Sequence, residues 1–165
     1  MMQRRALLLS TLAFVAAAAL GPPALAAPDF KSLTPLLIDL PGFDGEKAAG
    51  MTMDVGSGPM TTVSRQYKRG AAHVGVTVVM GEAAKGALAP VQMKLSMETA
   101  DGHMKTTEIA GFKALETYHD ASKSGNVLIA VADATLFSLE YRGLSEDEAV
   151  GLAQKFDLKA LAAAK

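Results

Sequence analysis

The stretch that decides the fold lies at residues 127–142, which read VLIAVADATLFSLEYR. Its two halves are rich in aliphatic and aromatic side chains and meet at Asp133 and Ala134, which predicts a tight antiparallel hairpin. In the second half, apolar and polar residues alternate, as they do in a strand with one buried face. The residues expected to point into the core are Phe137, Leu139 and Tyr141.

A helix is predicted directly after this hairpin. Ser145 and Glu148 have the spacing of a capping box, in which the serine hydroxyl accepts from the backbone N–H of Glu148 and the glutamate carboxylate reaches back. The helix is expected to run to about Phe156, with a buried stripe of Ala149, Leu152, Ala153 and Phe156. Asp157 should then cap a last short helix over residues 158–164.

Earlier segments predict more strands and two more helices. A proline at the first helical position favours a short helix at residues 34–38 and another at residues 90–98. The expected strands cover residues 51–55, 61–67, 73–80, 106–109 and 113–119. Tight turns between strands imply antiparallel pairing. The predicted fold is therefore α+β, with a single antiparallel sheet of about five to seven strands and helices on one face, including the C-terminal helix.

Residues 1–26 have the pattern of a cleavable signal peptide. Arg4 and Arg5 precede an apolar run at residues 7–20, a Gly-Pro-Pro break follows, and Ala24-Leu25-Ala26 fits the small-x-small cleavage rule. The run is short for a membrane span, which needs roughly 20 residues, and no span is expected after cleavage. The general secretory route and the twin-arginine route both stay open, and the expected location is periplasmic or secreted.

The composition narrows the function classes of residues 27–165, whose length suits a single α+β domain. The absence of cysteine excludes disulfides, a lipid anchor on cysteine, zinc–thiolate and iron–sulfur sites, and a cysteine nucleophile. The full chain has a formal net charge of -1, and residues 27–165, which lack Arg4 and Arg5, are more acidic. This charge argues against nucleic acid and anionic membranes as partners, because both favour a basic protein face. No cofactor is expected.

About a third of the chain resembles known exported proteins. Ile109-x-Gly111-Phe112-Lys113-Ala114, the hairpin ending Phe137-x-Leu139-x-Tyr141 and the Ser145-x-x-Glu148 helix are similar to small exported α+β proteins of the PsbP-like and LpqN-like kind. Residues 109–161 also resemble uncharacterised periplasmic proteins with a similar Asp-Leu-Lys-x-Leu-Ala tail. The resemblance implies a fold whose members mostly serve as accessory or binding modules, and a fold alone does not assign a function.

The sequence contains no pattern typical of a catalytic site. It has neither the Gly-x-Ser-x-Gly nor the Ser-x-x-Lys pattern of serine nucleophiles. Gly56-Ser57-Gly58 lacks a following lysine, which favours a flexible loop over a phosphate cradle. Glu116-x-x-His119 has the spacing of metal ligands on a helix. It lies in a predicted strand, however, where residues three apart face opposite sides of the sheet. No catalytic residue is assigned.

Methionine is the compositional oddity of residues 27–165. Thioethers are soft ligands that suit Cu(I), which makes Met51, Met53, Met60 and His103 a candidate copper site. The alternative is that methionines fill gaps in the core. Met51, Met53, Met93 and Met97 all fall on stripes expected to be buried, which favours core packing.

Taken together, these features favour an exported, non-enzymatic accessory or binding protein whose partner is a small molecule or a protein in the periplasm. Two alternatives stay open. One is a Cu(I)-binding protein that uses the methionines. The other is a small hydrolase whose site is assembled from residues far apart in the sequence.

Overall fold

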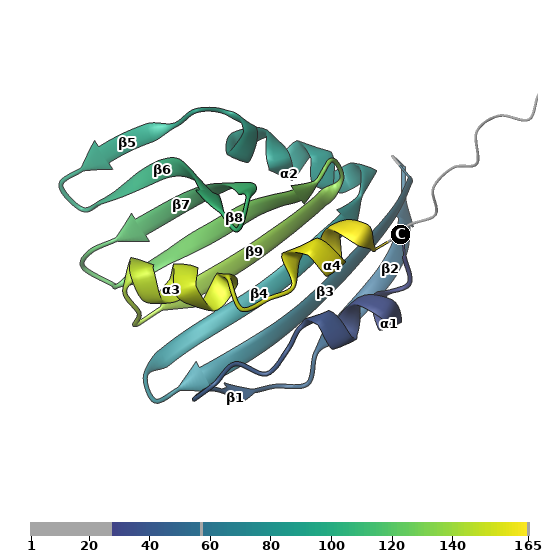
Figure 1. Ribbon diagram of the computed structural model, residues 1–165, viewed down its shortest axis with the longest axis horizontal. Coiled ribbons are helices and arrows are strands. Elements are labelled where there is room, and N and C mark those ends of the chain that lie inside the picture. Colours follow the sequence, from purple (N-terminus) through teal and green to yellow (C-terminus); the bar gives the residue numbers. More distant parts are fainter. Residues whose placement is uncertain (1–27, 57, 165) are drawn as a thin grey trace, which may run out of the picture.

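The computed structural model describes residues 28–56 and 58–164, so the predicted signal peptide at residues 1–26 lies outside the described residues. The helices, drawn as coils in Figure 1, are α1 (Phe30–Leu33), the 3-10 helix η1 (Thr34–Leu36), α2 (Glu82–Gln92), α3 (Glu146–Ala153) and α4 (Leu158–Ala163). The strands are β1 (Asp44–Gly45), β2 (Ala49–Val55), β3 (Gly58–Arg69), β4 (Ala72–Gly81), β5 (Ser96–Thr99), β6 (Gly102–Ile109), β7 (Phe112–His119), β8 (Ser124–Ala132) and β9 (Thr135–Arg142). Within the described ranges, no helix is long and apolar enough to span a membrane.

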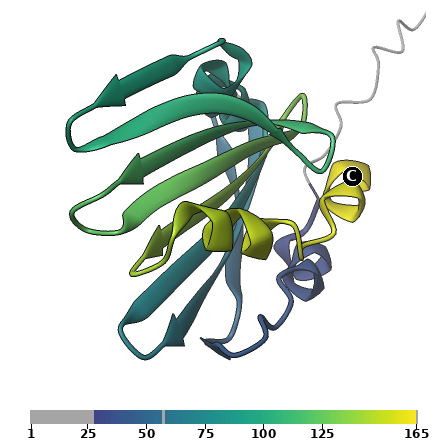
Figure 2. The same cartoon turned by 60° about the vertical axis from the view of Figure 1, so that its left-hand side comes forward.

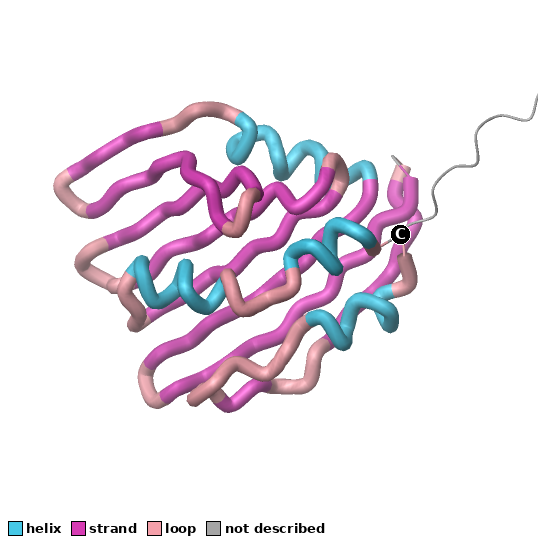
Figure 3. Tube along the Cα trace, in the orientation of Figure 1, coloured by secondary structure: helices cyan, strands magenta, loops and turns pink. Residues whose placement is uncertain are grey.

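The strands form one antiparallel sheet in the order β1-β3-β4-β9-β8-β7-β6-β5, with β2 paired to β3 beside β1. One meander holds β1 to β4, another holds β5 to β9, and α2 connects them. The two meanders join at the centre of the sheet, where β4 pairs with β9 (Figure 3). The predicted antiparallel sheet is confirmed, with more strands than expected. The additional strands are β1, which has two residues, and β5, whose residues are all exposed, so neither carries an alternating pattern.

One face of the sheet, called here the helix face, carries α1, α3 and α4 (Figure 2). Alternation in β4 and β9 places Val76, Val78, Phe137 and Leu139 on this face, where all four are fully buried. Phe156, just after α3, covers them, and its ring centroid lies 5.2 Å from that of Phe137. The predicted β8–β9 hairpin is therefore confirmed, and so is the burial of Ala149, Leu152, Ala153 and Phe156, although α3 ends at Ala153 rather than at Phe156.

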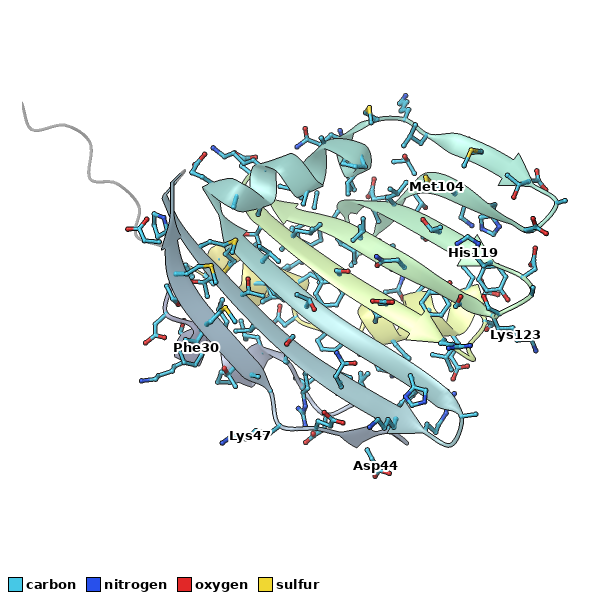
Figure 4. The ribbon with its side chains drawn as sticks, turned by 180° about the vertical axis from the view of Figure 1, so that it is seen from behind. Phe30, Asp44, Lys47, Met104, His119 and Lys123 are labelled. Atoms are coloured by element: carbon cyan, nitrogen blue, oxygen red, sulfur yellow. The ribbon has the colours of Figure 1, made fainter. Side chains whose placement is uncertain are left out.

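The opposite face, called here the open face, carries α2 (Figure 4). Leu88 and Val91 of α2 pack against Leu115 of β7 and Leu136 of β9, and these strand residues alternate with those of the helix face. The prediction that the helices lie on one face is wrong. The apolar patch that contains Leu115 and Leu136 needs a cover of its own, and α2 supplies it.

The predicted helix at residues 90–98 is also wrong. The helix α2 begins earlier, at Glu82, and Pro90 lies inside it rather than at its start. Burial of Leu88 and Val91 stabilises α2 and outweighs the backbone hydrogen bond that Pro90 cannot donate. Met97, expected on that helix, lies in β5.

Two helix starts differ from the prediction in detail. The first helix begins before Thr34, because the Asp29 carboxylate accepts a backbone hydrogen bond and caps α1. At α3, Ser145 Oγ accepts from the backbone N–H of Glu148 at 3.3 Å, as predicted. The Glu148 carboxylate does not complete the capping box, because it binds the Arg69 guanidinium at 2.6 Å.

Candidate functional site

The open face has an apolar half and a polar half, and the alternation along β9 marks the boundary. Leu136 lies beneath α2, and Ser138, Glu140 and Arg142 follow at every second position beyond the helix. The helix therefore covers one end of the open face and leaves the polar side chains uncovered.

Register aligns polar residues from five strands into two neighbouring rows across this uncovered half. Cross-strand partners share one face of a sheet, so these side chains all project away from α1, α3 and α4. The first row consists of Gln66, Gly75, Glu140, Asn126 and Thr117. The second row consists of His73, Arg142, Ser124 and His119.

The two rows line a hollow of about 520 Å³ that extends over β3, β4, β9 and β8. A second hollow, of about 430 Å³, continues toward β7 and shares Ser124, Glu140 and Tyr141 with the first. The two hollows are called here the open-face trough. Besides the two rows, their lining includes Thr77, Ser122, Gly125, Ser138 and Tyr141. His119, near one end, is labelled in Figure 4.

Gly75 of β4 forms part of the floor of the first hollow. Its row neighbours, Gln66 and Glu140, carry long side chains, whereas the glycine carries none. A Cβ added at Gly75 would lie 3.0 Å from Gln66 Oε1, so the Gln66 amide leans over the glycine. A glycine inside a strand often marks a place where another group comes close to the backbone.

The trough is rich in hydrogen-bonding groups of mixed character. Glu140 supplies a carboxylate and Arg142 a guanidinium, and the other lining side chains are mainly hydroxyls, amides and imidazoles. Ser138 Oγ donates to Asn126 Oδ1 at 3.1 Å, which leaves the NH2 group of that amide for another partner. Pockets of several hundred Å³ are usual for small ligands, although most are apolar. A ligand that fits these groups must itself be polar.

A separate group of charged side chains, called here the Glu116–Glu146 cluster, lies on the helix face and also contains His103 and Lys105. Lys105 Nζ lies 2.9 Å from Glu146 Oε1 and 3.3 Å from Glu116 Oε2, and His103 Nε2 lies 3.0 Å from Glu146 Oε1. Glu146 is the first residue of α3, so the cluster ties the start of that helix to β6 and β7.

The two carboxyls of this cluster have pKa values shifted in opposite directions. Burial raises the pKa of Glu116, and the hydrogen bond between its carboxyl and that of Glu146 raises it further. Burial alone would also raise the pKa of Glu146, but hydrogen bonds from Glu116, Lys105 and His103 outweigh it and lower the pKa to about 2. Of the two carboxyls, Glu146 is therefore the one that keeps its negative charge to the lower pH.

We expect Glu146→Gln to lower the free energy of unfolding at pH 7 by about 1.5–3 kcal/mol, the cost of losing hydrogen bonds to a charged group. Because the pKa of Glu146 is lowered from 4.5 to about 2, its stabilisation is present above about pH 4.5 and is lost as the pH falls toward 2. The loss caused by the substitution should therefore be smaller at about pH 3. Urea unfolding of both proteins at pH 7 and at about pH 3 measures this loss in the free energy of unfolding.

Glu116→Gln is the matched control. A glutamine has nearly the shape of the glutamate side chain, and its NH2 group can donate to Glu146, so this variant should lose less than about 1 kcal/mol at pH 7. Equal losses for the two variants, or a Glu146→Gln loss that does not change with pH, would contradict the lowered pKa of Glu146.

Glu116 and His119 lie on opposite faces of β7, as predicted. Glu116 is buried on the helix face, whereas His119 is exposed on the open face and lines the trough. The two residues lie on one strand with two residues between them, so they cannot share an ion. No group of three or more His, Asp or Glu side chains among residues 28–56 and 58–164 is placed to hold a metal ion.

The prediction that the methionines pack in the core is wrong for Met51, Met53, Met93 and Met97, all of which are exposed. Met51 and Met53 lie on β2 at an edge of the sheet, on the open face, and Met97 lies on β5 at the other edge. The helices α1, α3 and α4 cover the helix face, and on the open face α2 packs on Leu115 and Leu136. Side chains on the outer strands of the open face therefore stay in solvent.

The structure brings together only part of the candidate copper site. Met53 and Met60 are register partners on β2 and β3, and Met51 lies one row further on the same face. His103 lies on β6, five strand spacings or about 24 Å from β3, and it points to the helix face. His103 is therefore excluded from any site with these methionines, and its ring bonds to Glu146.

Sequence patterns missed both the trough and the Glu116–Glu146 cluster. Each is assembled by strand register from positions far apart in the chain, and periodicity within one segment does not predict register between segments. Two local signals were present: the polar outer positions of β9, and Gly75 between two buried valines of β4. Both are common features of strands and did not by themselves predict a site.

Comparison with known proteins gives no relative for this chain: no family model, no curated protein and no solved structure matches it.

Proposed function

We propose that this protein is an exported, non-enzymatic binding protein that takes a small polar ligand in the open-face trough. The observation that carries the proposal is the arrangement of the trough: two rows of hydrogen-bonding side chains from five strands, uncovered by any described helix and hollowed at Gly75. Export rests on the arginine pair, the apolar run and the Ala24-Leu25-Ala26 motif of the sequence.

The ligand class follows from the lining. Hydroxyl, amide and imidazole groups can both donate and accept hydrogen bonds, so they suit molecules with several hydroxyl or amide groups. Glu140 and Arg142 lie at neighbouring outward positions of β9, which also allows a ligand with both an amino and a carboxyl group. Saccharides, amino acids and dipeptides are therefore the probes of choice.

A small hydrolase is the competing function, and the Glu116–Glu146 cluster favours it. Two carboxyls with pKa values shifted apart are typical of an acid and base pair. Both carboxyls, however, contact Lys105 and lie on the face opposite the trough. We therefore assign the two carboxyls the role of holding the start of α3 against the sheet. Hydrolysis of an ester, glycoside or peptide substrate that is lost in Glu116→Gln would support the hydrolase instead.

The experiment is a calorimetric screen of a panel of monosaccharides, oligosaccharides, amino acids and dipeptides against the purified protein. Gly75→Thr places a branched side chain on the trough floor, where the nearest atoms belong to the flexible end of Gln66. It should leave stability nearly unchanged, because threonine suits a strand, and it should weaken binding by about tenfold or more.

Ser96→Thr, a similar addition on the exposed strand β5, is the control and should bind as the original protein does. Binding that survives Gly75→Thr would place the ligand elsewhere. A panel in which no member binds would remove the proposed ligand classes.

A further inference from the structure

The hairpin of β2 and β3 exposes large apolar side chains on the open face. Thr52 and Thr61 lie on the helix-face side, where their hydroxyl oxygens are 3.0 Å apart; Thr61 is fully buried, whereas Thr52 is exposed. Met51 and Met53, at the alternating positions, point outward and are 54% and 37% exposed. Burial of apolar surface therefore does not explain why methionines occupy these two exposed positions.

Three thioethers lie close together on the outward side of this hairpin. Met53 and Met60 are direct register partners, and Met51 lies diagonally across from Met60. Cβ atoms of direct partners lie about 5 Å apart and those of diagonal neighbours about 7–8 Å apart, and a methionine side chain is long and flexible enough to close these gaps. Sulfur atoms are seen on this face over the β2–β3 hairpin in Figure 4.

We propose that Met51, Met53 and Met60 form a binding site for a soft monovalent cation, Cu(I) or Ag(I). Thioethers are neutral, polarizable ligands that prefer soft ions to borderline or hard ones such as Zn(II) or Mg(II). Three of them on one face offer a trigonal set of sulfurs. Solvent exposure, which is costly for an apolar side chain, is what a site needs for the ion to enter. The site lies outside the lining of the open-face trough, so it is a second site and does not depend on the ligand proposed there.

The other edge of the open face supplies an internal control. Met97 and Met104 are also direct register partners, on β5 and β6. Met104 packs against the apolar cluster under α2, and the residue diagonal to it on β5 is Thr99 rather than a third methionine. This pair has the same cross-strand geometry without the three-sulfur set, so it should bind a soft ion far more weakly.

The test measures Cu(I) affinity by competition with a chromogenic Cu(I) chelator, with Ag(I) titration as a redox-inert check. The original protein should bind one ion per chain and should not bind Zn(II). Met53→Leu combined with Met60→Leu should weaken binding by far more than the factor of about 10–100 that the loss of a merely supporting group causes. Methionine and leucine have similar volumes, so urea unfolding should change little.

Two control variants keep the proposal falsifiable. Met97→Leu combined with Met104→Leu, and His103→Ala alone, should both retain the affinity of the original protein. Failure of the original protein to compete with a micromolar chelator would overturn the site. So would an equal loss of affinity in either control, because the three methionines would then not be the ligands.

Discussion

Phe156→Ala is expected to lower the free energy of unfolding by about 3–5 kcal/mol, the usual cost of removing a buried aromatic ring. The Phe156 side chain is 4% exposed and packs at 5.2 Å against Phe137, which is itself fully buried at the centre of the helix face. Its removal leaves a cavity between α3 and the sheet. Against a total stability of about 5–15 kcal/mol, this loss threatens folding.

Ser145→Ala is the matched comparison in the same part of the chain. It removes the hydroxyl that caps α3 and leaves the core untouched, so the expected loss is about 1 kcal/mol. Urea unfolding of both variants and of the original protein measures the two losses in the free energy of unfolding. Losses of equal size would show that the segment around Phe156 does not pack on the sheet.

Gly125→Ala is also expected to be strongly destabilising. A Cβ at this position of β8 would lie 2.0 Å from the backbone oxygen of Thr117 on β7 and 2.6 Å from the Tyr141 hydroxyl. The backbone oxygen cannot move without shifting one strand against the other, so the loss should reach about 2–4 kcal/mol, at the upper end for added bulk in a packed region.

Gly86→Ala shows what an alanine does where space is available. A Cβ at Gly86 would meet no atom within 4 Å, and the residue is exposed on α2. Alanine is the better helix former, so this variant should gain about 0.5–1 kcal/mol. Thermal unfolding of Gly125→Ala and Gly86→Ala compares their stabilities with that of the original protein. A stable Gly125→Ala protein would contradict the close contact between β7, β8 and Tyr141.

The elements that the sequence predicted well are those with strong local signals. The β8–β9 hairpin has a two-residue turn and a clear alternation through Phe137 and Leu139, and the structure confirms both. Ser145 and Asp157 each carry a side chain that caps the following helix, and both caps are confirmed. In these segments the local preference and the packing in the structure agree.

The errors arose where packing between distant segments outweighs local preference. Pro90 is a common first residue of a helix, yet α2 begins at Glu82 because its Leu88 and Val91 cover an apolar patch that belongs to other strands. Met51 and Met53 alternate like core residues, and only the position of β2 at the sheet edge shows that nothing covers them.

The candidate site could not be predicted for the same reason. Gln66, Gly75, Glu140, Asn126 and Thr117 become neighbours only because β4 pairs with β9, which joins the two meanders. A sequence in which polar residues alternate with core residues indicates that one face of a strand is exposed. It does not indicate which exposed positions of other strands lie beside it.

Amide chemical-shift mapping with the same panel of saccharides, amino acids and dipeptides tests the central claim most directly. A ligand held in the open-face trough should shift the amide signals of Gln66, Gly75, Asn126 and Glu140 and leave those of α3 and β5 unchanged. Shifts centred instead on Lys105, Glu116 and Glu146 would contradict this account, because the ligand would then occupy the helix face that we assign to holding α3 in place.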